Sequence, residues 1–217
     1  MRPAPFLLAT CILVGGAALY AMRPPTRPAP VSPVSPSPTA PATTPRSPSV
    51  LPTDPIRGSA NAPHTVIIFS DFTCPSCADA AQALQSIYAA HPSDVRIVWK
   101  DLPILDRITG SRALHIAARC AQQEGKFWEF HDAFFAARPA NARMIDALRT
   151  AHQINPASFE ACRKGASAAE RVDANKREAA ALRLTGTPTL FIDGTPMPHA
   201  ITAANITDAL RTVRAPY

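Results

Sequence analysis

A Cys-Pro-Ser-Cys sequence at residues 74–77 is the feature most able to do chemistry. It follows an apolar, β-branched run at 65–69 that favours a buried strand, and it opens a stretch at 75–90 with helical periodicity. The dipole and free N–H groups of a helix favour a thiolate at Cys74, whereas Cys77, one turn further along, is expected to be shielded and to resolve mixed disulfides. A stable thiolate makes the disulfide oxidising, so the pattern predicts thiol–disulfide exchange.

Half of a zinc site and an inert structural disulfide are two other interpretations of this cysteine pair. Zinc normally needs a second close pair of ligands, whereas Cys120 and Cys162 each stand alone in the sequence. A structural disulfide rarely uses so small and strained a ring at a strand-to-helix turn. We therefore expect a redox pair that needs no metal and no cofactor.

A Gly-Thr-Pro-Thr sequence at residues 186–189 is the second chemical feature. Pro188 begins a predicted strand at 189–192, where its missing N–H suits a sheet edge or a cis peptide bond. From these residues alone, a trans proline in an ordinary loop is the better interpretation.

Cys120 and Cys162 bring the cysteines after residue 55 to an even count of four. Both fall on inward faces of predicted helices, at 112–124 and 156–164. A disulfide across these 42 residues can add up to ~4 kcal/mol by loop-entropy arithmetic. We predict this structural disulfide, with two separate buried thiols as the alternative.

Charged residues close to the first cysteine pair are given no catalytic role. Asp71, Asp79 and Lys100 are expected near Cys74. Asp79, in the first helical turn, would oppose a thiolate there and raise its pKa slightly. Lys100, with Asp101 after it, is typical of a solvated strand end.

The predicted elements are a strand, a helix and a strand, then a block of helices, a hairpin and a last helix. The strands at 65–69 and 95–99 with the helix at 75–90 form a βαβ unit with a right-handed crossover. His115 and His131, in the helical block, are expected to be surface or satisfied core histidines. The remaining elements are helices at 112–124, 126–137, 142–152, 156–164 and 167–184, strands at 189–192 and 195–198, and a helix at 203–213.

Three segments, residues 58–77, 112–135 and 184–194, together resemble the DsbA-like thiol:disulfide oxidoreductases. The resemblance covers nearly all of 56–217. It implies an α/β fold of the thioredoxin type, β-α-β then β-β-α, with the helical block at about 107–184 as an insertion.

The resemblance also implies roles for individual residues. Cys74 corresponds to the attacking cysteine, Cys77 to its redox partner and Pro188 to a cis-proline that lies against them. The backbone of Thr187 is then placed to pair with an extended substrate. The chain departs from the strongest oxidants of that family at Ser76, where they carry His, and at Thr187, where they carry Val.

The first 55 residues are typical of export and of a spacer. Residues 6–22 form an uncharged, mostly apolar run of 17 residues after Arg2, which indicates a signal anchor, with a cleaved signal peptide as the alternative. Residues 23–55 hold 12 of the 24 prolines and are expected to be a disordered linker. A ligand for an SH3-type domain is the other interpretation of such a segment.

The charge balance argues against nucleic acid as a partner. The chain carries +6, of which the first 55 residues supply +3, and no basic run lies in the rest. We expect a monomeric, periplasmic (extracytoplasmic) oxidoreductase, tethered to the inner membrane by residues 6–22. Its expected partners are exported cysteine-containing proteins, into which it introduces disulfides, and a membrane redox partner that resets its own disulfide.

Two alternatives to this function stay open at this point. One is a disulfide reductase that serves cytochrome or copper-centre assembly. The other, from a different class, is a metal-binding carrier that uses Cys74 and Cys77 as ligands. An isomerase is disfavoured, because a Pro-rich linker occupies the place of the added N-terminal domain that dimeric isomerases of this kind use.

Overall fold

The structure is a computed structural model that describes residues 47–212. The apolar segment at 6–22, and the linker up to residue 46, lie outside the described residues. Within the described part of the chain, no helix combines the length and the apolar character needed to cross a membrane.

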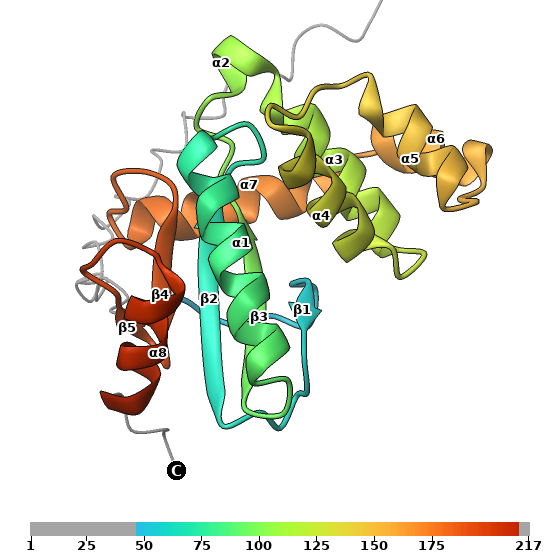
Figure 1. Cartoon of the computed structure of the whole chain (residues 1–217). Helices are drawn as coiled ribbons and strands as arrows, with labels where there is room; N and C mark the ends of the chain where they lie inside the picture. The colour runs from blue at the N-terminus through green and yellow to red at the C-terminus, as the bar shows by residue number, and fades with distance from the viewer. Residues whose placement is uncertain (1–46, 213–217) are drawn as a thin grey trace, which may run out of the picture. The chain divides into compact units, whose positions relative to one another are not determined.

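A five-stranded sheet with the order β1-β3-β2-β4-β5 forms the centre of the fold (Figure 1). β2 (His64–Ser70) and β3 (Val95–Asp101) pair in parallel, and β4 (Thr189–Ile192) joins the other side of β2 in antiparallel orientation. The edges are β1 (Ile56–Arg57) and β5 (Thr195–Pro196). α1 (Pro75–Ala90) connects β2 to β3, so the predicted βαβ unit is confirmed.

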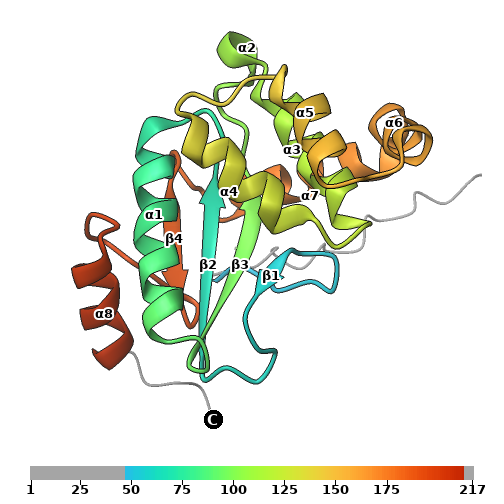
Figure 2. The same cartoon turned by 45° about the vertical axis from the view of Figure 1, so that its right-hand side comes forward.

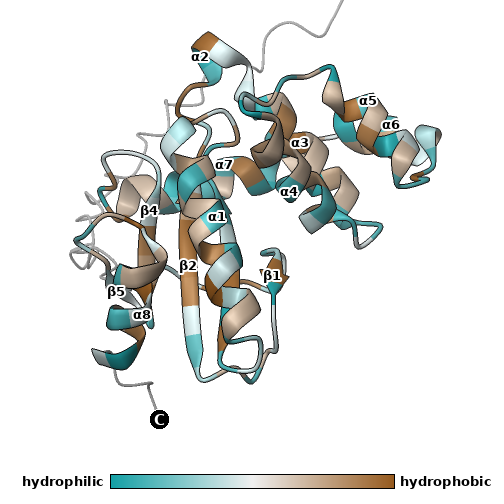
Figure 3. Cartoon of the chain, viewed as in Figure 1, coloured by the Kyte–Doolittle hydropathy of each residue, from teal (hydrophilic) through white to brown (hydrophobic). Residues whose placement is uncertain are grey.

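Side chains of β2 alternate between two apolar layers, because successive residues of a strand point to opposite faces. Val66 and Ile68 pack in the core beneath α1 and α8 (Ala203–Thr212). Ile67 and Phe69 belong to a smaller cluster on the other face, which includes Ala179 of α7. Figure 2 shows α1 and α7 on opposite sides of the strands, and Figure 3 shows that most of β2 is hydrophobic.

The helical block between β3 and β4 contains six helices within the described residues. α3 packs against α4, α6 and α7, and α7 also packs against β3, so the block is joined to the sheet. Asn155 caps α6, because its Oδ1 accepts hydrogen bonds from the N–H groups of Ala157 and Ser158. The bounds are α2 Asp106–Thr109, α3 Ser111–Gln122, α4 Phe127–Ala137, α5 Met144–Ala151, α6 Pro156–Lys164 and α7 Ala166–Ala181.

Two elements were not predicted, and several helix ends differ. β1 has two residues and α2 has four, and neither is long enough to show a hydrophobic period. The predicted helix at 167–184 ends at Ala181, and the predicted helix at 142–152 begins at Met144. These shifts are of the size expected at helix ends, where turns fray.

The predicted boundary of the linker at residue 55 was wrong. Pro48 is buried, Ser49 donates hydrogen bonds to Glu178 of α7, and Asp54 is buried against Lys100. The folded part therefore includes at least residues 48–55. The sequence did not show this because the segment binds through ion pairs and a few contacts, without an apolar period.

Lys100 was predicted to be solvated, and this was also wrong. Its side chain is 0% exposed, and its Nζ lies 2.7 Å from Asp54 and 2.9 Å from Glu178. A buried ammonium needs such compensation, and here two carboxylates from distant parts of the chain supply it. Asp101, the next residue, is buried as well.

Candidate active site

Cys74 lies at the junction of β2 and α1, after a turn formed by residues 71–73. It is the N-cap residue of α1, and its carbonyl oxygen accepts hydrogen bonds from the N–H groups of Cys77 and Ala78. Pro75 begins the helix, where a missing N–H costs nothing. The strand-to-helix connection thus places Cys74 at the positive end of a 16-residue helix dipole.

The Cys74 thiol has hydrogen-bond partners of two kinds. Its Sγ lies 3.1 Å from Oγ of Ser76, which can donate to a thiolate, and 3.7 Å from the carbonyl oxygen of Thr187, which accepts from the protonated thiol. Burial raises the pKa of this thiol, but hydrogen bonds with the side chains of Ser76, Cys77 and Thr187 lower it by more, so the pKa lies below its ordinary value. Cys74 is 8% exposed, which is less than we expected for the open end of a helix.

Cys77 lies one turn further along α1 and is 0% exposed. Burial raises the pKa of its thiol to about 12, against the opposing effect of the hydroxyl groups of Ser70 and Thr187 and of the Asp71 N–H. That N–H donates to Sγ of Cys77 at 3.5 Å. Neither cysteine is in a disulfide in this structure. The pair is therefore asymmetric: one thiol is disposed to ionise, and the other holds its proton.

The loop before β4 lies against this pair. The Thr187–Pro188 peptide bond is cis, and the Thr187 carbonyl oxygen faces Sγ of Cys74. The hydroxyl of Thr189 donates to the Gly186 carbonyl oxygen at 2.8 Å and closes the loop. The structure thus brings together the two sequence features that lie more than a hundred residues apart.

An apolar groove of about 290 Å³ gives access to Cys74. Phe72, Phe134 and Phe135 supply much of its lining, with Arg138 and Pro139 at the end of α4. Phe134 and Phe135 fit the apolar period of a core helix, so their place at a site was not predicted. Their role at the groove depends on where α4 meets α1.

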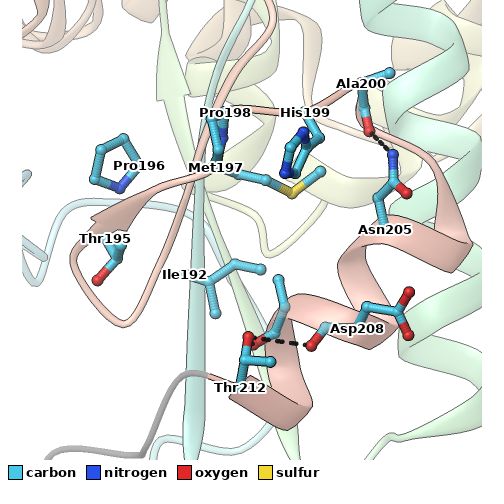
Figure 4. Close-up of a pocket in the computed structure, with 11 residues that line it drawn as sticks. Ile192, Thr195, Pro196, Met197, Pro198, His199, Ala200, Asn205, Asp208 and Thr212 are labelled. Atoms are coloured by element: carbon cyan, nitrogen blue, oxygen red, sulfur yellow. Dashed lines mark hydrogen bonds between the residues drawn. The ribbon is translucent and has the colours of Figure 1, made fainter.

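A larger pocket, of about 670 Å³, lies between the β5 loop and α8 (Figure 4). Ile192, Met197 and Ala209 line its apolar part, and the amide of Asn205 donates to the Ala200 carbonyl oxygen at its rim. None of its lining residues is a cysteine. Size alone therefore does not locate the reactive centre, and we place the site at the smaller groove.

The predicted influence of Asp79 on Cys74 is not supported by its position. Asp79 lies beyond the first turn of α1, and its carboxylate pairs with Arg138 at 2.7 Å. Both side chains are largely exposed, so the pair is screened by solvent. The charge of Asp79 is thus partly balanced and is not among the causes of the shifted pKa of Cys74.

Cys120 on α3 and Cys162 on α6 are joined by a disulfide, with their Cα atoms 5.7 Å apart. The bond lies within the helical block and links two helices that also pack against each other. It is therefore separate from Cys74 and Cys77 at the start of α1.

A buried charged network lies behind the turn that precedes Cys74, and it was not predicted from the sequence. Asp71 and Asp101 are both fully buried, and His115 of α3 lies between them. The available signal was their position: each acid ends or follows one of two adjacent parallel strands, whose carboxyl ends meet at one edge of the sheet. His131 is also buried, as a core histidine, and its Nδ1 donates a hydrogen bond to the Asp132 carboxylate.

Within residues 47–212, no three His, Cys, Asp or Glu side chains are grouped so that they could hold a metal ion.

Comparison with known proteins agrees with this geometry. Residues 50–212 match the family described as Thioredoxin. The chain belongs to this thioredoxin family. Its architecture, with the helical insertion, is that of the DsbA-like thiol:disulfide oxidoreductases.

Solved structures of this kind align over most of the chain. A thioredoxin-like oxidoreductase from Silicibacter pomeroyi is 25% identical, with a TM-score of 0.68, and the alignment covers 76% of this chain and 95% of that one. BdbD from Bacillus subtilis is 21% identical, also with a TM-score of 0.68, over 76% of this chain and 94% of its own. The thiol-disulfide exchange protein alpha-DsbA2 from Wolbachia pipientis is 18% identical, with a TM-score of 0.65, over 73% and 86%.

Curated relatives of this thioredoxin-family chain include much longer proteins. The Na(+)/H(+) antiporter NhaA 3 of Salinispora tropica is 35% identical over 155 residues, which are 67% of this chain and 23% of the antiporter. The antiporter NhaA of Herminiimonas arsenicoxydans is 29% identical over 74% of this chain and 26% of its own length. The chain thus spans about a quarter of these relatives, and the similarity concerns one segment of each.

Proposed function

We propose that this chain is an extracytoplasmic thiol:disulfide oxidoreductase that introduces disulfides into exported proteins through Cys74 and Cys77. The observation that carries the proposal is the asymmetry of the pair. Cys74 lines a groove and has a lowered pKa, whereas Cys77 is fully buried and has a pKa raised to about 12. An exchange reaction needs one accessible sulfur and one protected sulfur in this arrangement.

In the proposed reaction, the enzyme begins with a Cys74–Cys77 disulfide. A substrate thiolate attacks Sγ of Cys74, the Cys74–Cys77 bond breaks, and Cys77 leaves with the electron pair and takes up a proton. The Asp71 N–H, 3.5 Å from Sγ of Cys77, stabilises the departing sulfur. The product is a mixed disulfide between Cys74 and the substrate.

A second thiolate of the substrate then attacks the substrate sulfur of the mixed disulfide. Cys74 leaves as a thiolate, and the substrate keeps the new disulfide while the enzyme holds two electrons. The helix N-terminus and the Ser76 hydroxyl stabilise this leaving group, which speeds release. A membrane redox partner that offers its own disulfide would then reset the enzyme.

The cis Thr187–Pro188 loop is proposed to hold the substrate during these steps. The Thr187 backbone lies next to Sγ of Cys74, and an extended substrate strand could pair with it. The groove beside Phe72 and Phe134 offers apolar contact to substrate residues that flank the cysteine. These contacts support a polypeptide substrate rather than a small molecule.

The reduction potential of the Cys74–Cys77 pair tests the direction of electron flow. In glutathione buffers with site-resolved thiol tagging, a value of about −120 to −200 mV supports a disulfide donor. A value of about −270 mV, as in thioredoxin, would instead favour the reductase alternative. Tight, stoichiometric zinc or copper on the reduced protein would favour a metal carrier.

The location is proposed from the N-terminal segment. Residues 6–22 would act as an inner-membrane anchor, with residues 23–46 as the spacer that holds the folded part in the periplasm. Fractionation and N-terminal sequencing of the mature chain test this: a membrane-bound chain with Met1 or residue 2 at its end supports the anchor, and a soluble chain cut near residue 20 contradicts it.

A further inference from the structure

A buried histidine lies between two buried aspartates directly behind the redox turn. His115 of α3 is 0% exposed. Its Nδ1 lies 2.7 Å from a carboxylate oxygen of Asp101, and its Nε2 lies 3.9 Å from a carboxylate oxygen of Asp71. Ser70, the residue before Asp71, pairs with Asp101 in the parallel register of β2 and β3. Asp71 and Asp101 therefore lie together at the carboxyl ends of these strands.

Asp71 contacts both redox cysteines through its main chain. Its N–H donates to Sγ of Cys77 at 3.5 Å, and its carbonyl oxygen accepts from the N–H of Cys74 at 3.1 Å. Its carboxylate accepts hydrogen bonds from the N–H groups of Thr73 at 2.9 Å and Leu105 at 3.0 Å. The charge of Asp71 is therefore held beneath the turn that carries Cys74.

Among the described residues, His115 is the basic side chain that faces the Asp71 carboxylate. Asp101 already has a cation of its own, because Nε of Arg119 lies 2.5 Å from its other carboxylate oxygen. The remaining donors to the Asp71 carboxylate are neutral: two N–H groups and the hydroxyls of Thr73 and Ser111. On α4, the ring of His131 packs near Phe72, as the ring of His115 does, and burial lowers the pKa of His131.

The pKa shifts of His115 and Asp71 have the directions expected when two opposite charges stabilise each other. Burial opposes the charge on His115, but hydrogen bonds and charges from Asp101 and Asp71 raise its pKa above the ordinary value. Burial likewise opposes the charge on Asp71, but His115 and the backbone donors lower its pKa to about 2. The directions of these two shifts favour an imidazolium at His115 and a carboxylate at Asp71.

We propose that His115 is a positioning residue for the redox pair: fixed by Asp101, its imidazolium compensates the buried negative charge of Asp71 and so favours the thiolate of Cys74. The inference rests on the proposed function, in which Cys74 is the reacting sulfur. Without the imidazolium, the Asp71 carboxylate keeps its four neutral donors and its charge. That charge then acts on the adjacent turn uncompensated, which disfavours a thiolate at Cys74.

The variant His115→Asn in the full chain tests this proposal. We expect the pKa of Cys74, followed by the ultraviolet absorbance of its thiolate, to rise, and the equilibrium with glutathione to shift about three- to tenfold towards the protein disulfide. A merely structural role for His115 would lower stability without moving these two quantities. A folded His115→Asn protein with an unchanged pKa and an unchanged glutathione equilibrium would overturn the proposal.

His131→Asn is the matched control. His131 is also buried, and the centroid of its ring lies 5.9 Å from that of Phe72, compared with 4.6 Å for the ring of His115. Its hydrogen-bond partner is Asp132 on its own helix, and not Asp71. We expect this variant to leave both readouts at their wild-type values, and a shift equal to that of His115→Asn would contradict a specific role for His115.

A double-mutant cycle with Asp71→Asn separates charge compensation from other effects. Once the charge of Asp71 is removed, His115→Asn should change the pKa of Cys74 much less than it does in the wild-type background. Equal effects of His115→Asn in both backgrounds would mean that the histidine does not act through Asp71.

A measurement on the unaltered protein decides the question even if the variants do not fold. Nitrogen NMR of labelled histidines should show His115 protonated on both ring nitrogens at neutral pH, with signals that differ between oxidised and reduced protein. A neutral His115 would overturn the proposal. A wild-type protein that never equilibrates with glutathione would instead contradict the proposed function itself.

Discussion

At the scale of single residues, the chemistry depends on how differently two thiols are surrounded. Cys74 has the helix N-terminus and a hydroxyl near its sulfur, whereas Cys77 is enclosed by the core and by one N–H group. Burial penalises a thiolate, so the pKa of the fully enclosed sulfur is raised, whereas hydrogen bonds lower the pKa of the sulfur at the helix end. The division of roles follows from position on α1.

Cys74→Ser should abolish exchange. Cys77→Ser should trap substrates when the Cys74 thiolate attacks a substrate disulfide, because Cys77 is then missing and cannot displace the substrate from the mixed disulfide. Non-reducing gels of cells that express each variant, followed by mass spectrometry of the adducts, check both outcomes. A Cys74→Ser protein with full activity would falsify the mechanism.

Ser76→His should make the disulfide more oxidising. A histidine there would place a cationic group near Sγ of Cys74, where the Ser76 hydroxyl now lies at 3.1 Å. We expect the pKa of Cys74 to fall by about one unit, with an approximately tenfold shift of the glutathione equilibrium towards reduced protein. Ser76→Ala is the control and should move both quantities the opposite way.

At the scale of elements, the helical block is held by one covalent link and by packing. The Cys120–Cys162 bond closes a loop of 42 residues between α3 and α6. The double variant Cys120→Ala/Cys162→Ala should lose about 2–4 kcal/mol of unfolding free energy, because the unfolded chain regains loop entropy. Urea unfolding checks the loss. The potential of Cys74–Cys77 should be little changed, since the bond does not contact that pair.

Asp71 and His115, which meet where β2, β3 and α3 join, should make the free energy of unfolding depend on pH in two pH ranges. The pKa of Asp71 is lowered to about 2, so its contribution is present above its unfolded pKa of about 3.9 and is lost as the pH falls towards 2. The pKa of His115 is raised, so its contribution is complete below its unfolded pKa of about 6.5 and is lost as the pH rises through the folded value. Urea unfolding across pH, with Asp71→Asn as the comparison, checks the acid window: the variant should lose less stability there.

At the scale of the whole molecule, the segment before β1 belongs to the folded part. Asp54 supplies one of the two carboxylates that compensate the buried Lys100. A chain that begins at residue 47 should therefore fold like the full protein, whereas a chain that begins at residue 56 leaves Lys100 with Glu178 alone. We expect the shorter chain to be about 3 kcal/mol less stable, as measured by urea unfolding. Equal stability of the two would show that the Asp54 contact contributes nothing.

Much of this protein could be predicted from the order of its residues, because the relevant signals are local. A buried strand, a helix that starts at Pro75 and two cysteines at its start are all visible as short-range patterns, and they predicted the βαβ unit and thiol chemistry. The thioredoxin-type fold as a whole followed from the resemblance of three segments to a known family. The helix predicted at 156–164 likewise matches α6, which Asn155 caps and Pro156 begins. Periodicity and caps act within a few residues, so no tertiary information was needed.

The tertiary structure alone decided which charges are buried and what compensates them. Lys100 and Asp101 at a strand end have the same local pattern as a solvated pair, yet their partners come from residues 54, 115, 119 and 178. The groove beside Cys74 also exists only because α4 meets α1 there. A buried charge is stable only when an opposite charge lies close to it in the folded protein. The partners here are far apart in the sequence, so no local spacing pattern could predict these contacts.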